Sequence, residues 1–99
     1  MSKLLENENG EIYIDNEVIA QFAGHAALDC FGIVGMASLS VKMDDDGLYI
    51  NFHIIVSYGV NIRTVVDNLI STVKYQVEDY TNMKVNKINV YVEGVRVID

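Results

Sequence analysis

The stretch that most constrains the fold is Val56–Tyr80, with the sequence VSYGVNIRTVVDNLISTVKYQVEDY. Gly59 is expected to turn the chain at the end of a strand, and apolar residues then recur at spacings of three and four. This spacing places them on one face of a long helix and leaves the charged residues elsewhere. A helix with one apolar face needs another layer to cover that face, and a sheet is expected here. The apolar face consists of Ile62, Val65, Val66, Leu69, Val73, Val77 and Tyr80.

The segment before this helix has the alternation of a β-strand. Apolar residues occupy every second position from Leu48 to Val56, and mainly polar or aromatic residues lie between them. The preceding Asp44–Gly47, DDDG, is typical of a tight turn, and residues 33–43 are expected to be extended. Together these segments predict a hairpin. The same alternation over residues 88–92 predicts a final strand after the long helix.

The N-terminal part of the chain predicts a leader, a short strand and a first helix. Residues 1–9 are polar and acidic after Leu5, and we expect them to be a flexible leader. Residues 11–14 alternate as a short strand, and Asp15 or Asn16 can cap the helix that follows. Gly32 stands where this helix is expected to end, because glycine readily adopts the left-handed conformation that ends helices. Residues 10–99 are therefore predicted to form a single domain.

The resulting order, βαββαβ, predicts an α+β fold. Two helices with one apolar face each are best buried on the same face of one mostly antiparallel sheet, which gives a two-layer sandwich. The other face of the sheet then carries a mixture of aromatic, aliphatic and polar side chains. Tyrosine suits an interface that is sometimes exposed to water, so this face is a candidate surface for self-association or partner docking. An open sheet face with ordinary β-favouring residues is an equally good explanation. The candidate interface residues are Tyr13, Tyr49, His53, Ile55 and Tyr91.

Composition excludes several classes of function. The formal net charge is −7, which repels nucleic-acid phosphates and anionic lipid headgroups, so neither nucleic-acid binding nor direct membrane insertion is expected. No apolar run approaches the roughly twenty residues needed to span a bilayer. The N-terminus lacks the apolar run of a signal peptide, and the single cysteine cannot form an internal disulfide. We therefore expect a cytoplasmic protein.

No residue pattern in the chain predicts catalysis, a metal site or a cofactor site. His25, His53 and Cys30 lack the spacing of metal ligands or of a nucleophile with its base, so ordinary structural roles are expected. The acidic turn Asp44–Gly47 lacks the later ligands of a calcium loop. Gly32–Gly35 matches the GxxG of a nucleic-acid-binding KH loop, but no lysine or arginine is near it in sequence. An enzyme is not predicted.

Several motifs resemble the alkaline shock protein, or envelope-stress-response, family of Gram-positive bacteria. They occur in one order along nearly the whole chain, and the match is with the short, single-domain members. The motifs are Gly10 with Ile12, Asn16–Ala20, Ala23-Gly24 with Ala26-Ala27, Gly32–Met36, Val56–Gly59, Val73–Tyr75, Ile88–Val92 and Gly94–Val97.

This resemblance implies a cytoplasmic, non-enzymatic scaffold that acts in cell-envelope stress homeostasis. Such a protein would associate with itself and would be held near the membrane by a membrane-anchored protein of the same family. Other short members imply an alternative, the regulation of fatty-acid or phospholipid metabolism through a lipid enzyme or an acyl ligand. Many relatives carry an extra charged stretch after the GIVGM motif, which this chain lacks at residues 37–39. The motif itself can be a structural turn or a partner-docking loop, made of Gly32, Ile33, Val34, Gly35 and Met36.

Overall fold

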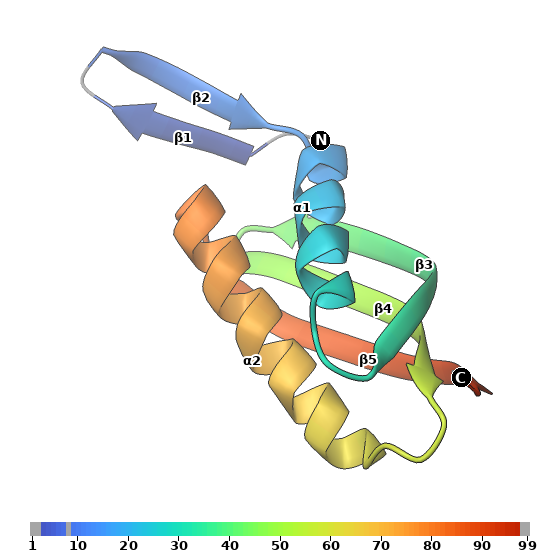
Figure 1. Ribbon diagram of the computed structural model, residues 1–99. Coiled ribbons are helices and arrows are strands. Elements are labelled where there is room, and N and C mark those ends of the chain that lie inside the picture. Colours follow the sequence, from blue (N-terminus) through green and yellow to red (C-terminus); the bar gives the residue numbers. More distant parts are fainter. Residues whose placement is uncertain (1–2, 8, 98–99) are drawn as a thin grey trace.

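The computed structural model describes the backbone of residues 3–7 and both backbone and side chains of residues 9–97 (Figure 1). Two helices and five strands make up this part of the chain. In order they are β1 (Lys3–Asn7), β2 (Gly10–Ile14), α1 (Asn16–Leu28), β3 (Ile33–Asp44), β4 (Gly47–Ser57), α2 (Ile62–Thr81) and β5 (Val85–Arg96).

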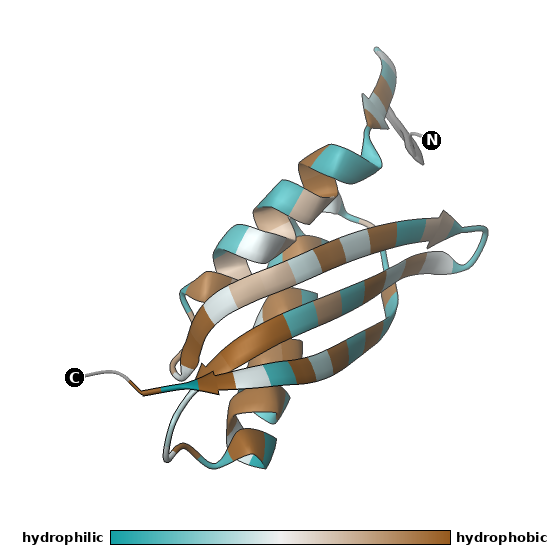
Figure 2. Cartoon of the chain, turned by 90° about the vertical axis from the view of Figure 1, so that its right-hand side faces the viewer, coloured by the Kyte–Doolittle hydropathy of each residue, from teal (hydrophilic) through white to brown (hydrophobic). Residues whose placement is uncertain are grey.

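The central sheet has the strand order β3-β4-β5, and both helices lie on one of its faces (Figures 1 and 2). Strands β3 and β4 form the expected hairpin and pair antiparallel. Strand β5 pairs parallel with β4, because α2 carries the chain back to the end of the sheet where β4 began. Of the three strand pairings described, two are antiparallel, and the predicted two-layer α+β fold is confirmed.

The N-terminal hairpin differs from the sequence prediction. Strands β1 and β2 form a separate two-stranded sheet in which Asn7 pairs with Gly10. Part of the segment expected to be a leader is therefore a strand. Strand β2 is paired with β1 in this separate sheet and is not a strand of the central sheet, so the prediction that placed Tyr13 on the open face of the central sheet is wrong. In Figure 1 this hairpin projects away from the rest of the chain.

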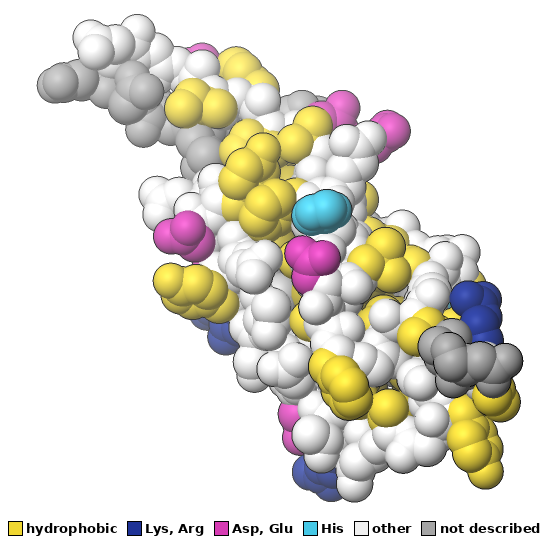
Figure 3. All heavy atoms as spheres, viewed as in Figure 1, with side chains coloured by type: hydrophobic (Ala, Val, Ile, Leu, Met, Phe, Trp, Pro, Cys, Tyr) yellow, Lys and Arg dark blue, Asp and Glu magenta, His cyan; other side chains and the backbone are white. Residues whose placement is uncertain are grey.

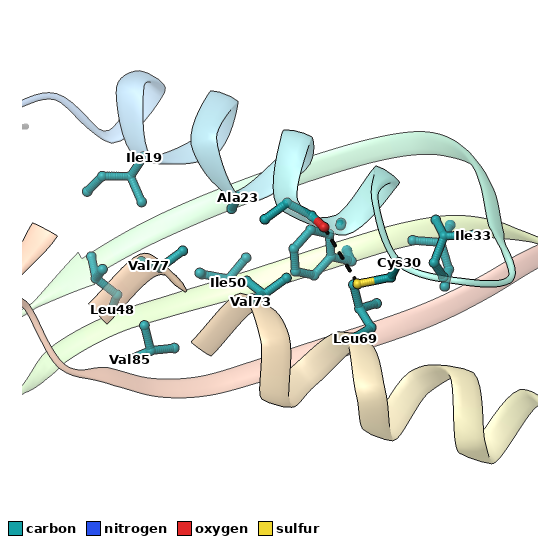
Figure 4. Close-up of a cluster of buried hydrophobic side chains, with 14 of the residues drawn as sticks. Ile19, Ala23, Cys30, Ile33, Leu48, Ile50, Leu69, Val73, Val77 and Val85 are labelled. Atoms are coloured by element: carbon teal, nitrogen blue, oxygen red, sulfur yellow. Dashed lines mark hydrogen bonds between the residues drawn. The ribbon is translucent and has the colours of Figure 1, made fainter. Parts of the chain in front are cut away.

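The core lies between the central sheet and the two helices (Figure 4). Every second residue of β4 is fully buried, as the alternation predicted. From α2 the buried residues are Val65, Leu69, Val73, Val77 and Thr81, so the predicted apolar face is correct in its middle and wrong at its ends. Ile62 and Tyr80 are exposed instead, and Tyr80 stacks on Phe22 with ring centroids 4.1 Å apart.

Side chains define the ends of both helices. Asp15 caps α1 by accepting a hydrogen bond from the backbone N–H of Glu17, at 3.2 Å. Asn61 caps α2 by accepting one from the backbone N–H of Thr64, at 3.0 Å. At the other end of α2, Asn82 adopts the left-handed conformation with φ of 58°, which ends the helix and directs the chain into β5. Asn61 and Asn82 thus fix where α2 begins and ends, and with that where α2 lies on the sheet.

Candidate interaction surfaces

The open face, meaning the side of the central sheet turned away from α1 and α2, is uncovered by any element in residues 3–7 and 9–97 (Figure 2). Each residue of β4 on this face has a neighbour on β3 and another on β5. The face is therefore built of four cross-strand rows with distinct chemistry. From the hairpin turn toward the C-terminus they are Lys42–Tyr49–Lys87, Ser40–Asn51–Asn89, Ser38–His53–Tyr91 and Gly35–Ile55–Gly94.

His53 is held in place on the open face by two neighbours on β5. Its Nδ1 lies 2.5 Å from the Oε2 atom of Glu93, and its ring stacks on Tyr91 with centroids 4.6 Å apart and planes 14° apart. One row away, Asn89 donates a hydrogen bond to Asn51 at 2.9 Å. These side chains already have defined positions, so a partner would meet a largely preorganised surface. Tyr91 remains 50% exposed and is available for contact.

Ile55 lies between two glycines on the open face. Gly35 on β3 and Gly94 on β5 are its cross-strand neighbours, so neither neighbour in the row carries a side chain. The guanidinium of Arg96 reaches the Gly35 side, where its Nη1 donates to the carbonyl of Val34 at 3.4 Å. A Cβ atom built on either glycine would lie in ordinary contact with Ile55, at 3.5 Å for Gly35 and 3.7 Å for Gly94. The aliphatic side chain of Ile55 is therefore partly exposed in an otherwise polar and aromatic surface.

The structure brings together four of the five predicted interface residues. Tyr49, His53 and Ile55 on β4 and Tyr91 on β5 share the open face. Tyr13 lies instead on the N-terminal hairpin, where its hydroxyl donates a hydrogen bond to Glu11 at 2.8 Å. The two-residue periodicity of β4 predicted the first three, whereas nothing in that periodicity shows which strand pairs with residues 11–14.

The predicted docking loop, residues 32–36, is mostly a strand. Only Gly32 lies in the turn, with φ of 86°, and Ile33–Met36 begin β3. Ile33 pairs with Val56 and is buried in the core. The prediction of a loop was wrong because the hairpin with β4 extends to the end of the sheet, where the N–H of Ser57 also donates to the carbonyl of Gly32 at 2.9 Å.

The residues that do project at this end of the molecule were missed by the sequence reasoning. Phe31 is 79% exposed and Tyr58 is 71% exposed, and each directly precedes a glycine with positive φ. An aromatic residue directly before a glycine in a turn is the sequence signal that could have identified these two exposed residues. We define the tip as the exposed apolar residues of this end, which are Phe31, Tyr58, Ile62, Val95 and Val97.

Cys30, the acidic turn and His25 were considered above as possible catalytic or metal-binding groups, and the structure shows what surrounds each of them. Cys30 is buried, its thiol lies 3.5 Å from the carbonyl of Ala26, and burial raises the pKa of the thiol. In the acidic turn, Asp46 accepts a hydrogen bond from the hydroxyl of Tyr49 at 3.0 Å, which raises the pKa of Tyr49. His25 is exposed on α1. Among the residues that the structure describes, no three His, Cys, Asp or Glu side chains are grouped to hold a metal ion.

Comparison with known proteins identifies the family. A sequence model of the alkaline shock protein family, which has a cell envelope-related function, matches residues 38–97, more than half of the chain. The chain belongs to the alkaline shock protein family. The resemblance seen in the motifs is thereby confirmed. Within the described residues, no helix of this family member is long and apolar enough to cross a membrane.

Two bacterial relatives align with almost the whole of this alkaline shock protein chain. The uncharacterized protein YloU of Bacillus subtilis is 40% identical over 117 aligned positions, covering 98% of each protein. The uncharacterized protein Spy1614 of Streptococcus pyogenes is 30% identical over 118 positions, covering 99% of this chain and 98% of its own. Both alignments are longer than the 99 residues of this chain, so each relative carries at least 18 positions with no counterpart here.

Solved structures share the fold at low sequence identity. The nickel form of a MamM CTD variant has a TM-score of 0.66, at 15% identity, over 79% of this chain and 96% of its own. The zinc form of the same variant has a TM-score of 0.58, at 17% identity, over 79% and 84% of the two chains. The two-layer fold therefore also occurs in proteins with little sequence in common with this chain.

Proposed function

We propose that this member of the alkaline shock protein family is a non-enzymatic scaffold of the cell envelope that works through the open face of its sheet. It associates with itself and docks to a membrane-anchored protein of the same family, which holds it near the membrane under envelope stress. The observation that carries this proposal is the uncovered face on which His53, Ile55 and Tyr91 lie side by side in two adjacent rows. The envelope-related function of the family supports it.

The chemistry of the open face suits association that can be reversed. Aromatic and amide groups dominate it, and such groups make contacts in a complex and remain soluble when separated. Three strands spaced about 4.8 Å apart and about 33 Å long give a footprint of roughly 500 Å² on each copy. Two such faces bury about 1,000 Å², near the lower limit for a specific interface. We therefore expect an oligomer that dissociates on dilution.

The test of this proposal is the double variant Ile55→Lys with Tyr91→Glu. The variant places two charges in the third and fourth rows of the open face without changing a buried residue, so the fold is expected to remain. Light scattering across a dilution series measures the mass, and a pull-down measures binding to a membrane-anchored relative. We expect both forms of association to be lost.

A matched control carries the same kinds of substitution on the helix layer. Val18 on α1 and Tyr75 on α2 are both exposed, so Val18→Lys with Tyr75→Glu makes closely similar changes in chemistry away from the open face. This control should retain the mass and the binding of the unmodified protein. An unchanged mass and unchanged pull-down for the open-face variant would show that the open face does not mediate association.

A second candidate function is the regulation of lipid metabolism through an acyl ligand. A hollow of about 390 Å³ beside the first turns of α2 favours it, because that volume is within the range of small-molecule sites. Phe31 and Val65 form its apolar part, and Asn61, Thr64 and Asn68 form its polar part. A saturable rise in melting temperature with acyl-CoA would support this candidate, and a flat response would exclude it.

A further inference from the structure

We propose that the tip is a membrane-contact site, which inserts its apolar side chains into the interfacial layer of a phospholipid bilayer. The tip consists of Phe31, Tyr58, Ile62, Val95 and Val97, all at one end of the molecule. This proposal does not depend on the function of the open face. It revises the expectation, drawn from net charge alone, that the protein makes no direct contact with lipid.

Three chain segments distant in sequence meet to form the tip. The N–H of Ser57 donates to the carbonyl of Gly32 at 2.9 Å, which joins the turn after α1 to the end of β4. The N–H of Tyr58 donates to the carbonyl of Arg96 at 2.8 Å, which joins the same region to the end of β5. In Figure 3 several hydrophobic side chains are visible as separate patches on the lower right of the molecule. The segments that carry the exposed apolar residues are thus joined at one end of the sheet.

The backbone of the tip is held in place, so insertion does not have to order it. Gly32 and Gly59 have φ of 86° and 90°, conformations that set the direction of the two turns. Val65 packs under Gly32, where a Cβ atom would lie only 2.7 Å from Cγ2 of the valine. The aromatic residues before these glycines project from a fixed base. Phe and Tyr at a membrane surface contribute apolar area, and the tyrosine hydroxyl can remain in the headgroup region.

Within residues 9–97, the charged side chains near the tip balance one another. Arg63 and Arg96, the two arginines of the sequence, both lie at this end. They offset Asp29 at the end of α1 and Asp67, whose carboxylate lies 3.8 Å from Arg63. Guanidinium groups also donate hydrogen bonds to the phosphate oxygens that zwitterionic and anionic lipids share. The described side chains of the tip region are therefore neutral overall.

The acidic side chains lie mainly at the opposite end of the sheet. Asp44 ends β3, Asp45 and Asp46 form the turn to β4, and Glu78 and Asp79 lie near the end of α2. The length of β4, Gly47–Ser57, separates this turn from Tyr58 by about 33 Å. The Debye length at physiological salt is about 8 Å, so repulsion between the acidic end and a lipid surface is largely screened when the tip faces the bilayer. Apolar insertion then determines binding and orientation.

Tryptophan fluorescence tests the proposal directly, because the chain contains no tryptophan. Phe31→Trp places a single reporter in the tip, and Tyr75→Trp places one at a position of similar exposure on α2. The probe is vesicles of phosphatidylcholine, with and without a minor fraction of phosphatidylglycerol. We expect a blue shift for Phe31→Trp only, retained at high salt because apolar insertion drives it. No shift for either variant, or an equal shift for both, would refute the proposal.

A second measurement separates insertion from the effect of one substitution. Phe31→Ser with Tyr58→Ser should lower the vesicle partition coefficient by about tenfold or more for each side chain removed. The matched control is Tyr13→Ser with Tyr75→Ser, which removes two similarly exposed aromatic residues outside the tip and should leave partition unchanged. Equal losses in both variants would refute the proposal. In the Phe31→Trp background, the open-face variant Ile55→Lys with Tyr91→Glu should keep the blue shift at saturating lipid. Membrane contact through the tip can therefore be tested independently of association through the open face.

Discussion

Truncation of Leu69 is the sharpest test of how α2 packs on the sheet. Leu69 lies in the middle of α2 and is 0% exposed, surrounded by the core of both layers (Figure 4). Leu69→Ala removes three buried carbon atoms, which costs about 2.4 kcal/mol in transfer free energy at about 0.8 kcal/mol for each carbon. The cavity left behind adds to this, so we expect the free energy of unfolding to fall by about 3–5 kcal/mol.

Urea denaturation monitored by far-UV circular dichroism measures this loss. Domains of this size have total stabilities of about 5–15 kcal/mol, so the variant should remain folded in water with a much lower midpoint. Asn68→Ala is the control, because Asn68 is the exposed neighbour on the same helix and should change stability by no more than about 0.5 kcal/mol. A loss below about 1 kcal/mol for Leu69→Ala would mean that α2 buries a different face.

Substitutions at three positions and a measurement on Cys30 test other parts of the structure. Thr81→Val should lower the free energy of unfolding by about 1–3 kcal/mol in urea denaturation, because it removes the hydroxyl that accepts from the N–H of Met83 and donates to the carbonyl of Val77, and so leaves the Met83 N–H without an acceptor. Thr81→Ser should retain most of the stability. Gly47→Ala should cost at least about 1–3 kcal/mol by the same assay, because φ is 136° and the new Cβ atom would lie 2.5 Å from the carbonyl oxygen of Lys84. Asn82→Ala should lower the thermal midpoint by straining a left-handed residue, at about 1 kcal/mol, whereas Asn82→Gly should not. The Cys30 thiol, whose pKa burial raises above its ordinary value of 9.0, should react more slowly with iodoacetamide than it does in urea. Because the unfolded chain releases this proton at lower pH than the native state, stability should also fall as pH rises above about 9.

Local periodicity was sufficient to predict the body of the fold. The apolar residues of α2 recur with the period of a helix, and those of β4 recur with the two-residue period of a strand, each over many residues. Burial in the structure follows both patterns. The prediction failed at the ends of α2, where the chain leaves the core. Tyr80 continues the helical spacing but lies beside Phe22 at the surface, while Thr81 enters the core because its hydroxyl donates back to the carbonyl of Val77.

Features that depend on pairing between distant segments could not be read from local patterns. Residues 11–14 have the alternation of a strand, but that alternation does not say whether the partner is the leader or the central sheet. For the same reason Tyr13 was assigned to the wrong surface. The tip was missed because Phe31, Tyr58 and Val95 are far apart in sequence. The pairing of β4 with β5 and the hydrogen bonds that join the three segments bring these residues to one end of the molecule.

The open face and the tip can act together only in one of two dimer geometries. Two copies that pack through their open faces with the two-fold axis along the strands place both tips at the same end. An axis across the strands places the tips at opposite ends. In the first geometry two tips contact one bilayer, and linkage raises the apparent affinity well above that of a single tip. Ile55→Lys with Tyr91→Glu would then weaken vesicle affinity although it leaves every tip residue intact, whereas in the second geometry the affinity per chain would not change. Vesicle titration of this variant therefore reports the orientation of the copies as well as their association.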